Sequence, residues 1–167
     1  RIRSRGLGDV YKRQGIRHIN VVGASLFPQE ELLDALELKH PSLLSFYKND
    51  DKYSREKLSG DLESLEAFYK DRGYADFEIE STQVSITPDR QQVYISIAVD
   101  EGQIYQVNKV NLVGELGDVK ADDLRSLIIV QEGQTFSQAL ITATEERLTN
   151  ALGNGGFTFA TASGVLR

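Results

Sequence analysis

The sequence from Arg72 to Gly102 reads RGYADFEIESTQVSITPDRQQVYISIAVDEG. Two runs rich in β-branched and aromatic residues flank Thr87-Pro88-Asp89-Arg90, which is a turn signal because proline fixes φ and aspartate can bond nearby backbone. From Gln92 to Asp100, apolar residues alternate regularly with other residues, as in a strand with one buried face. The stretch therefore predicts a β-hairpin.

The alternation changes phase within the first of these runs. Phe77 and Ile79 are apolar at odd positions. Val84 and Ile86 are apolar at even positions. One extra residue within Ser81-Thr82-Gln83 would restore a single buried face, and a β-bulge supplies such a residue. Because bulges are commonest at sheet edges, we expect a bent first strand that is exposed along one edge.

Composition limits the function classes. The 167 residues suffice for one ordinary domain or two small ones, and no run approaches the length of a membrane span. A net charge of −6 argues against a nucleic-acid partner, which requires a basic face. The chain has no cysteine, which excludes a disulfide framework and thiolate metal sites. It has no methionine either, so we expect it to be a piece of a longer protein.

The first residues carry no helical or strand period. Arginines cluster between Arg1 and Gln14, as in a nucleic-acid arm or a targeting peptide, but no apolar signal-peptide core follows. The segment Gly8–Gln14 resembles a translated sequencing-adaptor tail. We therefore expect residues 1–15 to be a non-native or disordered tail.

From Ile16 the chain predicts regular elements. Ile16–Gly23 has the pattern of a short strand, and Pro28 opens a helix that ends at His40-Pro41. A stronger helix follows, with Ser54 as the expected N-cap and Gly73 as the expected left-handed end. The loop before that helix carries an apolar cluster that forms either a lid on its own core or a partner-binding knob: Leu43, Leu44, Phe46 and Tyr47.

The pattern then restarts. Val107–Gly114 repeats the character of Ile16–Gly23. Short helices are expected over Lys120–Ile129 and from Ser137, and Phe157–Ala162 is expected to open a strand. The order strand–helix–helix–strand–strand thus occurs once complete and once without its last strand. This indicates an α+β fold built of tandem modules.

Several motifs together resemble those of POTRA modules. They are Ile19–Gly23, Gly60–Glu63, Asp71–Tyr74, Ser81–Val84, Thr87–Asp89 and Glu101-Gly102 with Tyr105. The resemblance implies tandem β-α-α-β-β modules, each a three-stranded sheet packed on two helices. Residues 16–103 resemble the third such repeat of an outer-membrane β-barrel assembly factor, and residues 104–167 resemble the fourth without its last strand. Gly153–Gly156 stands where the family more often has a bulkier, aromatic-rich end.

The resemblance also implies a function. It places the chain at the periplasmic face of the outer membrane of a Gram-negative bacterium. There it would bind unfolded outer-membrane proteins by β-strand addition and dock lipoproteins of the assembly machine, next to a C-terminal membrane barrel that belongs to the same protein. The alternative is a purely architectural spacer without direct substrate binding.

No residue pattern indicates catalysis, so we expect neither an enzyme nor a metal or other cofactor. His18 and His40 are the only histidines, and both are expected at the surface. Adjacent acids such as Asp122-Asp123 point apart on a helix and read as solvated faces. Gly153–Gly156 follows a helix and precedes a strand, the reverse of the order that a dinucleotide fingerprint requires.

The bent strand is therefore the candidate site. Glu78 and Glu80 can protect an edge against association, whereas the same edge can accept another extended chain. The residues alone leave these two interpretations equal, and the resemblance favours docking. The candidate binding residues are Glu78, Ile79, Glu80, Ser81, Thr82, Gln83, Val84 and Ser85.

Overall fold

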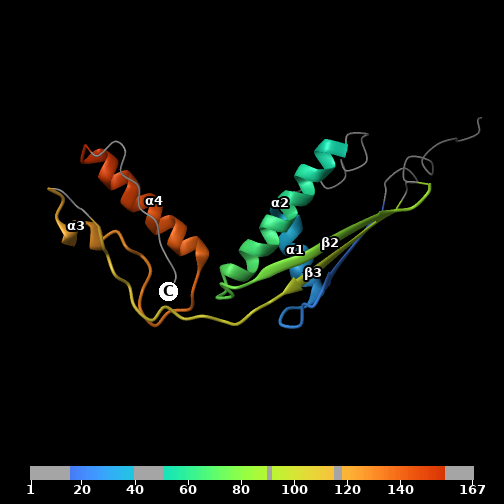
Figure 1. Ribbon diagram of the computed structural model, residues 1–167, viewed down its shortest axis with the longest axis horizontal. Coiled ribbons are helices and arrows are strands. Elements are labelled where there is room, and N and C mark those ends of the chain that lie inside the picture. The colour runs from blue at the N-terminus through green and yellow to red at the C-terminus, as the bar shows by residue number, and fades with distance from the viewer. Residues whose placement is uncertain (1–15, 40–50, 90–91, 115–117, 157–167) are drawn as a thin grey trace, which may run out of the picture. The chain divides into compact units, whose positions relative to one another are not determined.

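The computed structural model describes residues 16–39, 51–89, 92–114 and 118–156. Its elements (Figure 1) are β1 (Ile16–Val22), α1 (Gln29–Lys39), α2 (Asp51–Lys70), β2 (Glu78–Ile86), β3 (Gln92–Asp100), α3 (Ala121–Arg125) and α4 (Gln138–Asn154). They belong to two compact units: Arg1–Phe68 with Glu78–Glu101, and Tyr69–Phe77 with Gly102–Arg167. The expected α+β class is confirmed.

The first unit contains a three-stranded sheet in the order β1-β3-β2. β3 is central, because β1 pairs with it in parallel and β2 pairs with it antiparallel. The hairpin predicted from Arg72–Gly102 is therefore confirmed, and so is the edge position of its first strand. β1 forms the other edge.

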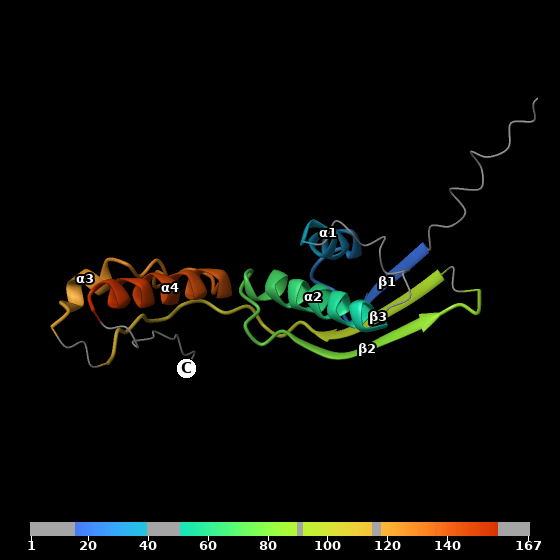
Figure 2. The same ribbon diagram turned by 90° about the horizontal axis from the view of Figure 1, so that it is seen from above.

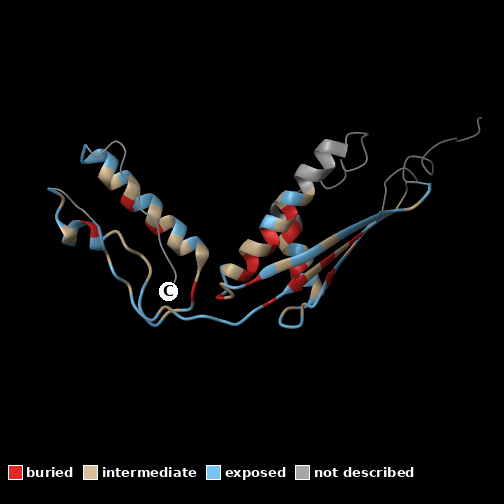
Figure 3. Ribbon diagram, viewed as in Figure 1, coloured by how far each residue is buried: buried red, intermediate tan, exposed pale blue. Residues whose placement is uncertain are grey.

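One face of this sheet is covered and the other is open. In Figure 2, α1 and α2 lie on the same side of the three strands, and buried positions gather where α2 faces β3 (Figure 3). The buried apolar side chains of this core include Val21, Leu32, Leu36, Leu65, Phe68, Ile95, Ile97 and Val99. Each contributes about 1.5–3 kcal/mol by leaving water, which holds the helices to the sheet.

The loop from β1 to α1 is fastened by a buried carboxylate. Glu101, just after β3, is 7% exposed. It accepts hydrogen bonds from the Ser25 backbone N–H, from the Ser25 hydroxyl at 3.0 Å and from the Leu26 backbone N–H at 3.1 Å. Bonds to a charged acceptor are the stronger kind, so Glu101 ties the loop to the end of the central strand.

The start of α2 differs from the expectation. The helix begins at Asp51 rather than after an N-cap at Ser54, so Ser54 lies inside it. The apolar cluster Leu43–Tyr47, His40, the tail at residues 1–15 and the strand expected from Phe157 all lie outside the described residues.

In the second unit the strand expected at Val107–Gly114 is not formed. The described residues there make one isolated antiparallel bridge, between Gln106 and Thr135. β1 is a strand because β3 receives its backbone hydrogen bonds, and an isolated extended segment lacks that partner. The helix expected over Lys120–Ile129 is also shorter, ending at Arg125. Of its predicted apolar residues Leu124 is buried, while Leu127 and Ile128 are half-buried.

α4 begins as expected. The Ser137 side chain accepts a hydrogen bond from the Leu140 backbone N–H at 3.4 Å, which satisfies one of the free donors of the first turn. The helix ends at Asn154, with Gly155 as its C-cap. Leu148 and Thr144 are its buried residues.

The turn Tyr69–Phe77 is held tightly within the second unit. Gly73 has a φ of +106°, and a Cβ there would lie 2.6 Å from the Thr135 Cγ2 and 2.7 Å from the Ile104 Cγ1. The Gly73 carbonyl accepts a hydrogen bond from the Tyr105 backbone N–H at 2.8 Å. Only glycine meets both the conformation and the space, and the expected positive φ at this residue is confirmed.

Candidate functional site

The bulge in β2 is present, and its extra residue is Glu80. Ile79 pairs with Val99 and Ser81 pairs with Ala98, so the register shifts between Ile79 and Ser81. The expected position, within Ser81–Gln83, is therefore wrong by one residue. Thr82 explains the error: it lies opposite buried Ile97 and is itself half-buried. Thr82 is polar although it lies on the buried face, so the alternation of apolar residues does not show that the phase has already changed at Glu80.

The hydrogen bonds next to the hairpin turn determine which backbone groups of β2 point outward. The Thr87 N–H donates to the Gln92 carbonyl oxygen at 3.0 Å, so these two residues form a hydrogen-bonded pair. Such pairs alternate along an antiparallel ladder. Ser81, Gln83 and Ser85 therefore bond to β3. Thr82, Val84 and Ile86 turn their N–H and C=O groups toward the free edge.

The two faces of β2 differ in polarity at this edge. Val84 and Ile86 lie on the helix-covered side, yet they are 43% and 58% exposed because no further strand adjoins them. Gln83 and Ser85 lie on the open side. An added strand would therefore meet an apolar row on one face and a polar row on the other.

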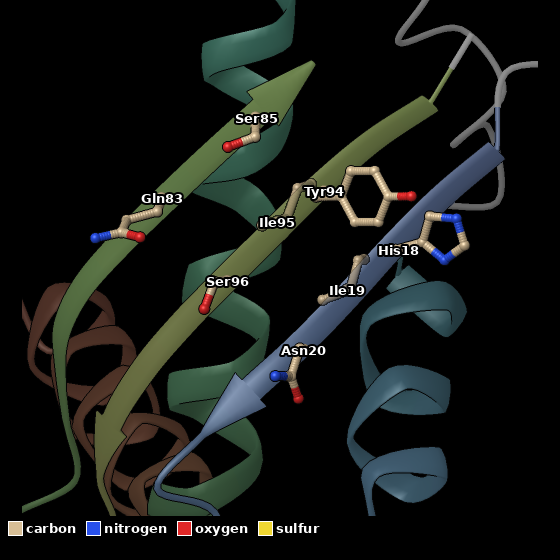
Figure 4. Close-up of a pocket in the computed structure, with 8 residues that line it drawn as sticks. All are labelled: His18, Ile19, Asn20, Gln83, Ser85, Tyr94, Ile95 and Ser96. Carbon is tan, nitrogen blue, oxygen red and sulfur yellow. The ribbon is translucent and has the colours of Figure 1, made fainter. Parts of the chain in front are cut away.

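The open face of the sheet carries a shallow hollow (Figure 4). It has a volume of about 260 Å³ and is lined by His18, Ile19, Asn20, Gln83, Ser85, Tyr94, Ile95 and Ser96. The rings of His18 and Tyr94 stack across β1 and β3, with centroids 4.7 Å apart and planes 13° apart. Its lining is mixed, with hydroxyls, amides and two stacked rings. The expected surface position of His18 is confirmed.

The structure divides the candidate residues into four groups: those before the bulge, the bulge residue, those bonded to β3 and those turned outward. Glu78 and Ile79 precede the bulge and pair with Asp100 and Val99. After the bulge at Glu80, the residues bonded to β3 are Ser81, Gln83 and Ser85, and the residues turned outward are Thr82 and Val84. Ile86, absent from the predicted set, is the third outward residue. The sequence did contain a sign of this, because Ile86 is apolar at an even position, as Val84 is.

No cluster of three or more histidine or acidic side chains able to hold a metal occurs among the described residues. In the same part of the chain, no helix combines the length and the apolar character that crossing a membrane requires.

The edge of β2 is a set of unpaired backbone donors and acceptors between two rows of side chains. Chemically, it can pair with extended backbone.

The family model for POTRA, described as "surface antigen variable number repeat", matches residues 14–102 and 105–165. The outer membrane protein assembly factor BamA of Neisseria meningitidis serogroup B is 24% identical over 155 residues, which cover 93% of this chain and 19% of the relative. The protein of the same name from Neorickettsia risticii is 27% identical over 144 residues, 86% of this chain and 19% of the relative.

Two solved structures share the fold. POTRA domains 3–5 of Haemophilus influenzae BamA superpose with a TM-score of 0.57 at 19% identity, covering 83% of this chain and 50% of that one. BamA of Haemophilus ducreyi lacking POTRA domains 1–3 gives a TM-score of 0.54 at 24% identity, covering 80% of this chain and 23% of that one. The resemblance drawn from the sequence motifs is confirmed by these likenesses and by the family match.

Proposed function

Because this chain belongs to the POTRA family, we propose that it is a non-enzymatic scaffold of an outer-membrane protein assembly machine, working at the periplasmic face of that membrane. Its relatives are named as outer membrane protein assembly factors, and the chain spans about a fifth of their length, 19% in each case. The two stretches matched by the family model support a division into modules at 16–103 and 104–167.

The free edge of β2 carries this proposal. Three successive outward residues, Thr82, Val84 and Ile86, offer N–H and C=O groups to an extended chain. Backbone pairing does not depend on the partner's side chains, so the edge can accept many sequences. We propose that its partners are unfolded outer-membrane β-barrel proteins.

The side chains of the edge fit that class of partner. Strands of membrane barrels alternate apolar and polar residues along their length. A strand added to β2 would place its apolar residues beside exposed Val84 and Ile86 and its polar residues beside Gln83 and Ser85. A strand in the wrong register would bring polar groups against the apolar row. The edge therefore favours amphipathic strands without selecting a particular sequence.

The interaction is expected to be weak. A backbone hydrogen bond contributes about 0.5–1.5 kcal/mol net, and three outward residues supply few of them. This barely exceeds the cost of association, so we expect dissociation constants on the order of micromolar to millimolar. Weak binding suits a scaffold that must release its client.

Two further roles belong to the same proposal. Lipoproteins of the machine dock on the scaffold, and a membrane barrel of the same protein anchors it. The competing function is an architectural spacer without client binding. The charge of Glu80 at the bulge favours that alternative, because charged bulges keep edges from pairing.

A titration separates the two functions. We would add a peptide from an unfolded porin strand to the isotopically labelled chain and follow the amide signals by NMR. Docking predicts shifts and slowed amide exchange at Thr82, Val84 and Ile86, with smaller effects at Gln83 and Ser85. A spacer shows no saturable change along β2 up to millimolar peptide.

A further inference from the structure

The sheet has a second edge, at β1, whose backbone groups can also be assigned. The even-numbered residues of β3 form their backbone hydrogen bonds with β2. The backbone N–H and C=O groups of Ile95 and Ile97 therefore point toward β1. In a parallel ladder each such residue bonds to the two neighbours of its partner. His18, Asn20 and Val22 therefore bond to β3. Ile19 and Val21 turn their N–H and C=O groups toward the free edge.

At Val21 this edge is occupied by a side chain. Gln29, the first residue of α1, accepts a hydrogen bond at Oε1 from the Val21 N–H at 3.0 Å. Its Nε2 donates to the Val21 carbonyl oxygen at 2.6 Å. A side-chain amide has the same donor and acceptor as a peptide group. Gln29 thus pairs with Val21 as one residue of an added strand would.

The edge of β2 differs in this respect. Within the described part of the chain, no hydrogen bond reaches the outward backbone groups of Thr82, Val84 or Ile86. β1 spans only Ile16–Val22, so closing Val21 leaves Ile19 and Arg17 as its only outward residues. Two outward residues give too little pairing to hold a strand in water.

We propose that the Gln29 amide closes the β1 edge and thereby confines strand addition to β2. The proposal rests on the proposed function, since it concerns which edge takes the client. Gln29 is a specificity-determining residue in this sense: it excludes the wrong edge and touches no client. It protects an edge with a polar mimic of a strand, where other proteins use charge or a bulge.

The test replaces the amide by an apolar side chain of similar size, Gln29→Leu, in the whole chain. The matched control is Gln138→Leu, because Gln138 is also the first residue of its helix and its side chain bonds only to Thr142 among the described residues. The probe is the porin-strand peptide, and the readout is amide exchange at Ile19 and Val21. With peptide at saturation we expect exchange at both amides to slow by about tenfold in Gln29→Leu. We expect no such change in the parent or in Gln138→Leu.

A second variant guards against a folding defect. Gln29→Glu keeps an acceptor for the Val21 N–H but cannot donate to the Val21 carbonyl. In this variant only the carbonyl of Val21 becomes available to an added strand. We expect weaker peptide protection of Ile19 in this variant than in Gln29→Leu. Equal protection of β1 in the parent, or none in either Gln29 variant, would overturn the proposal.

The outcomes also separate this proposal from the proposed function. Peptide protection at β2 in every variant, with none at β1, removes the role of Gln29 and leaves docking at β2 standing. Protection at β1 in Gln29→Leu, with none at β2 in any variant, removes docking at β2 and leaves the role of Gln29 standing.

Discussion

The N–H of Thr87 donates to the carbonyl oxygen of Gln92 at 3.0 Å, and this bond sets the hydrogen-bonding phase of all of β2 beyond the bulge. Neighbouring residues of one strand consequently have opposite environments. The N–H of Gln83 bonds to β3, whereas the N–H of Thr82 faces solvent at the edge.

Proline at these two positions should give opposite results for folding. Gln83→Pro removes a donor of the ladder and leaves a carbonyl of β3 without its partner, which should cost about 1–3 kcal/mol. Thr82→Pro removes a donor that has no ladder partner, and it should fold. Urea unfolding followed by circular dichroism measures both. Similar losses in the two variants would mean that the assigned phase is wrong.

The Glu101 carboxylate should be a large single contributor to the stability of the first unit. Glu101→Gln keeps the shape but removes the charge that strengthens its bonds to Ser25 and Leu26. We expect a loss of about 1–3 kcal/mol in the free energy of unfolding. Asp34→Asn, an exposed change in α1, is the control and should shift stability by less than about 0.5 kcal/mol. Equal effects of the two would show that the loop is not held by this carboxylate.

Two glycines should respond oppositely to alanine. Gly73→Ala forces a Cβ into Thr135 and Ile104 at a positive φ, and we expect a loss of about 1–3 kcal/mol. Gly153 lies in α4 with nothing within 4 Å of a Cβ, so Gly153→Ala should gain about 0.5–1 kcal/mol. Hydrogen exchange of the α4 amides reports both changes. A neutral Gly73→Ala would contradict the tight turn.

Tyr105 should titrate late. Its hydroxyl donates a hydrogen bond to the Asp76 carboxylate, and this bond, reinforced by the carboxylate charge, raises the pKa of Tyr105 above its ordinary value of 10.0. The raised pKa means that the contact stabilises the fold below the unfolded-state pKa and is lost as pH rises through the folded-state pKa. Asp76→Asn should bring the pKa back down, as read from the Tyr105 ring carbon by NMR. An identical titration in both proteins would exclude the contact in solution.

Most elements of the first unit could be predicted from the sequence, and fewer of those of the second. Regular alternation in Gln92–Asp100 predicted the central strand, and the phase change predicted a bulge. Its predicted position was one residue too late, because Thr82 is a polar residue on the covered side of the strand. The strand expected at Val107–Gly114 failed because local pattern does not supply a pairing partner. The pairing of Gln29 with Val21 had no signal in the sequence, since any glutamine at a helix start looks the same.

The central claim is that extended chains dock through the outward N–H groups of β2. Its most direct test measures the affinity of the porin-strand peptide for Thr82→Pro and for Thr82→Val, which keeps both the N–H and a β-branched side chain. If the claim holds, Thr82→Pro folds as the parent does by circular dichroism and loses about tenfold in affinity, as expected for one lost hydrogen bond of about 1.4 kcal/mol. Thr82→Val should bind as the parent does. A folded Thr82→Pro that binds as tightly as Thr82→Val would contradict the claim and leave the spacer function in its place.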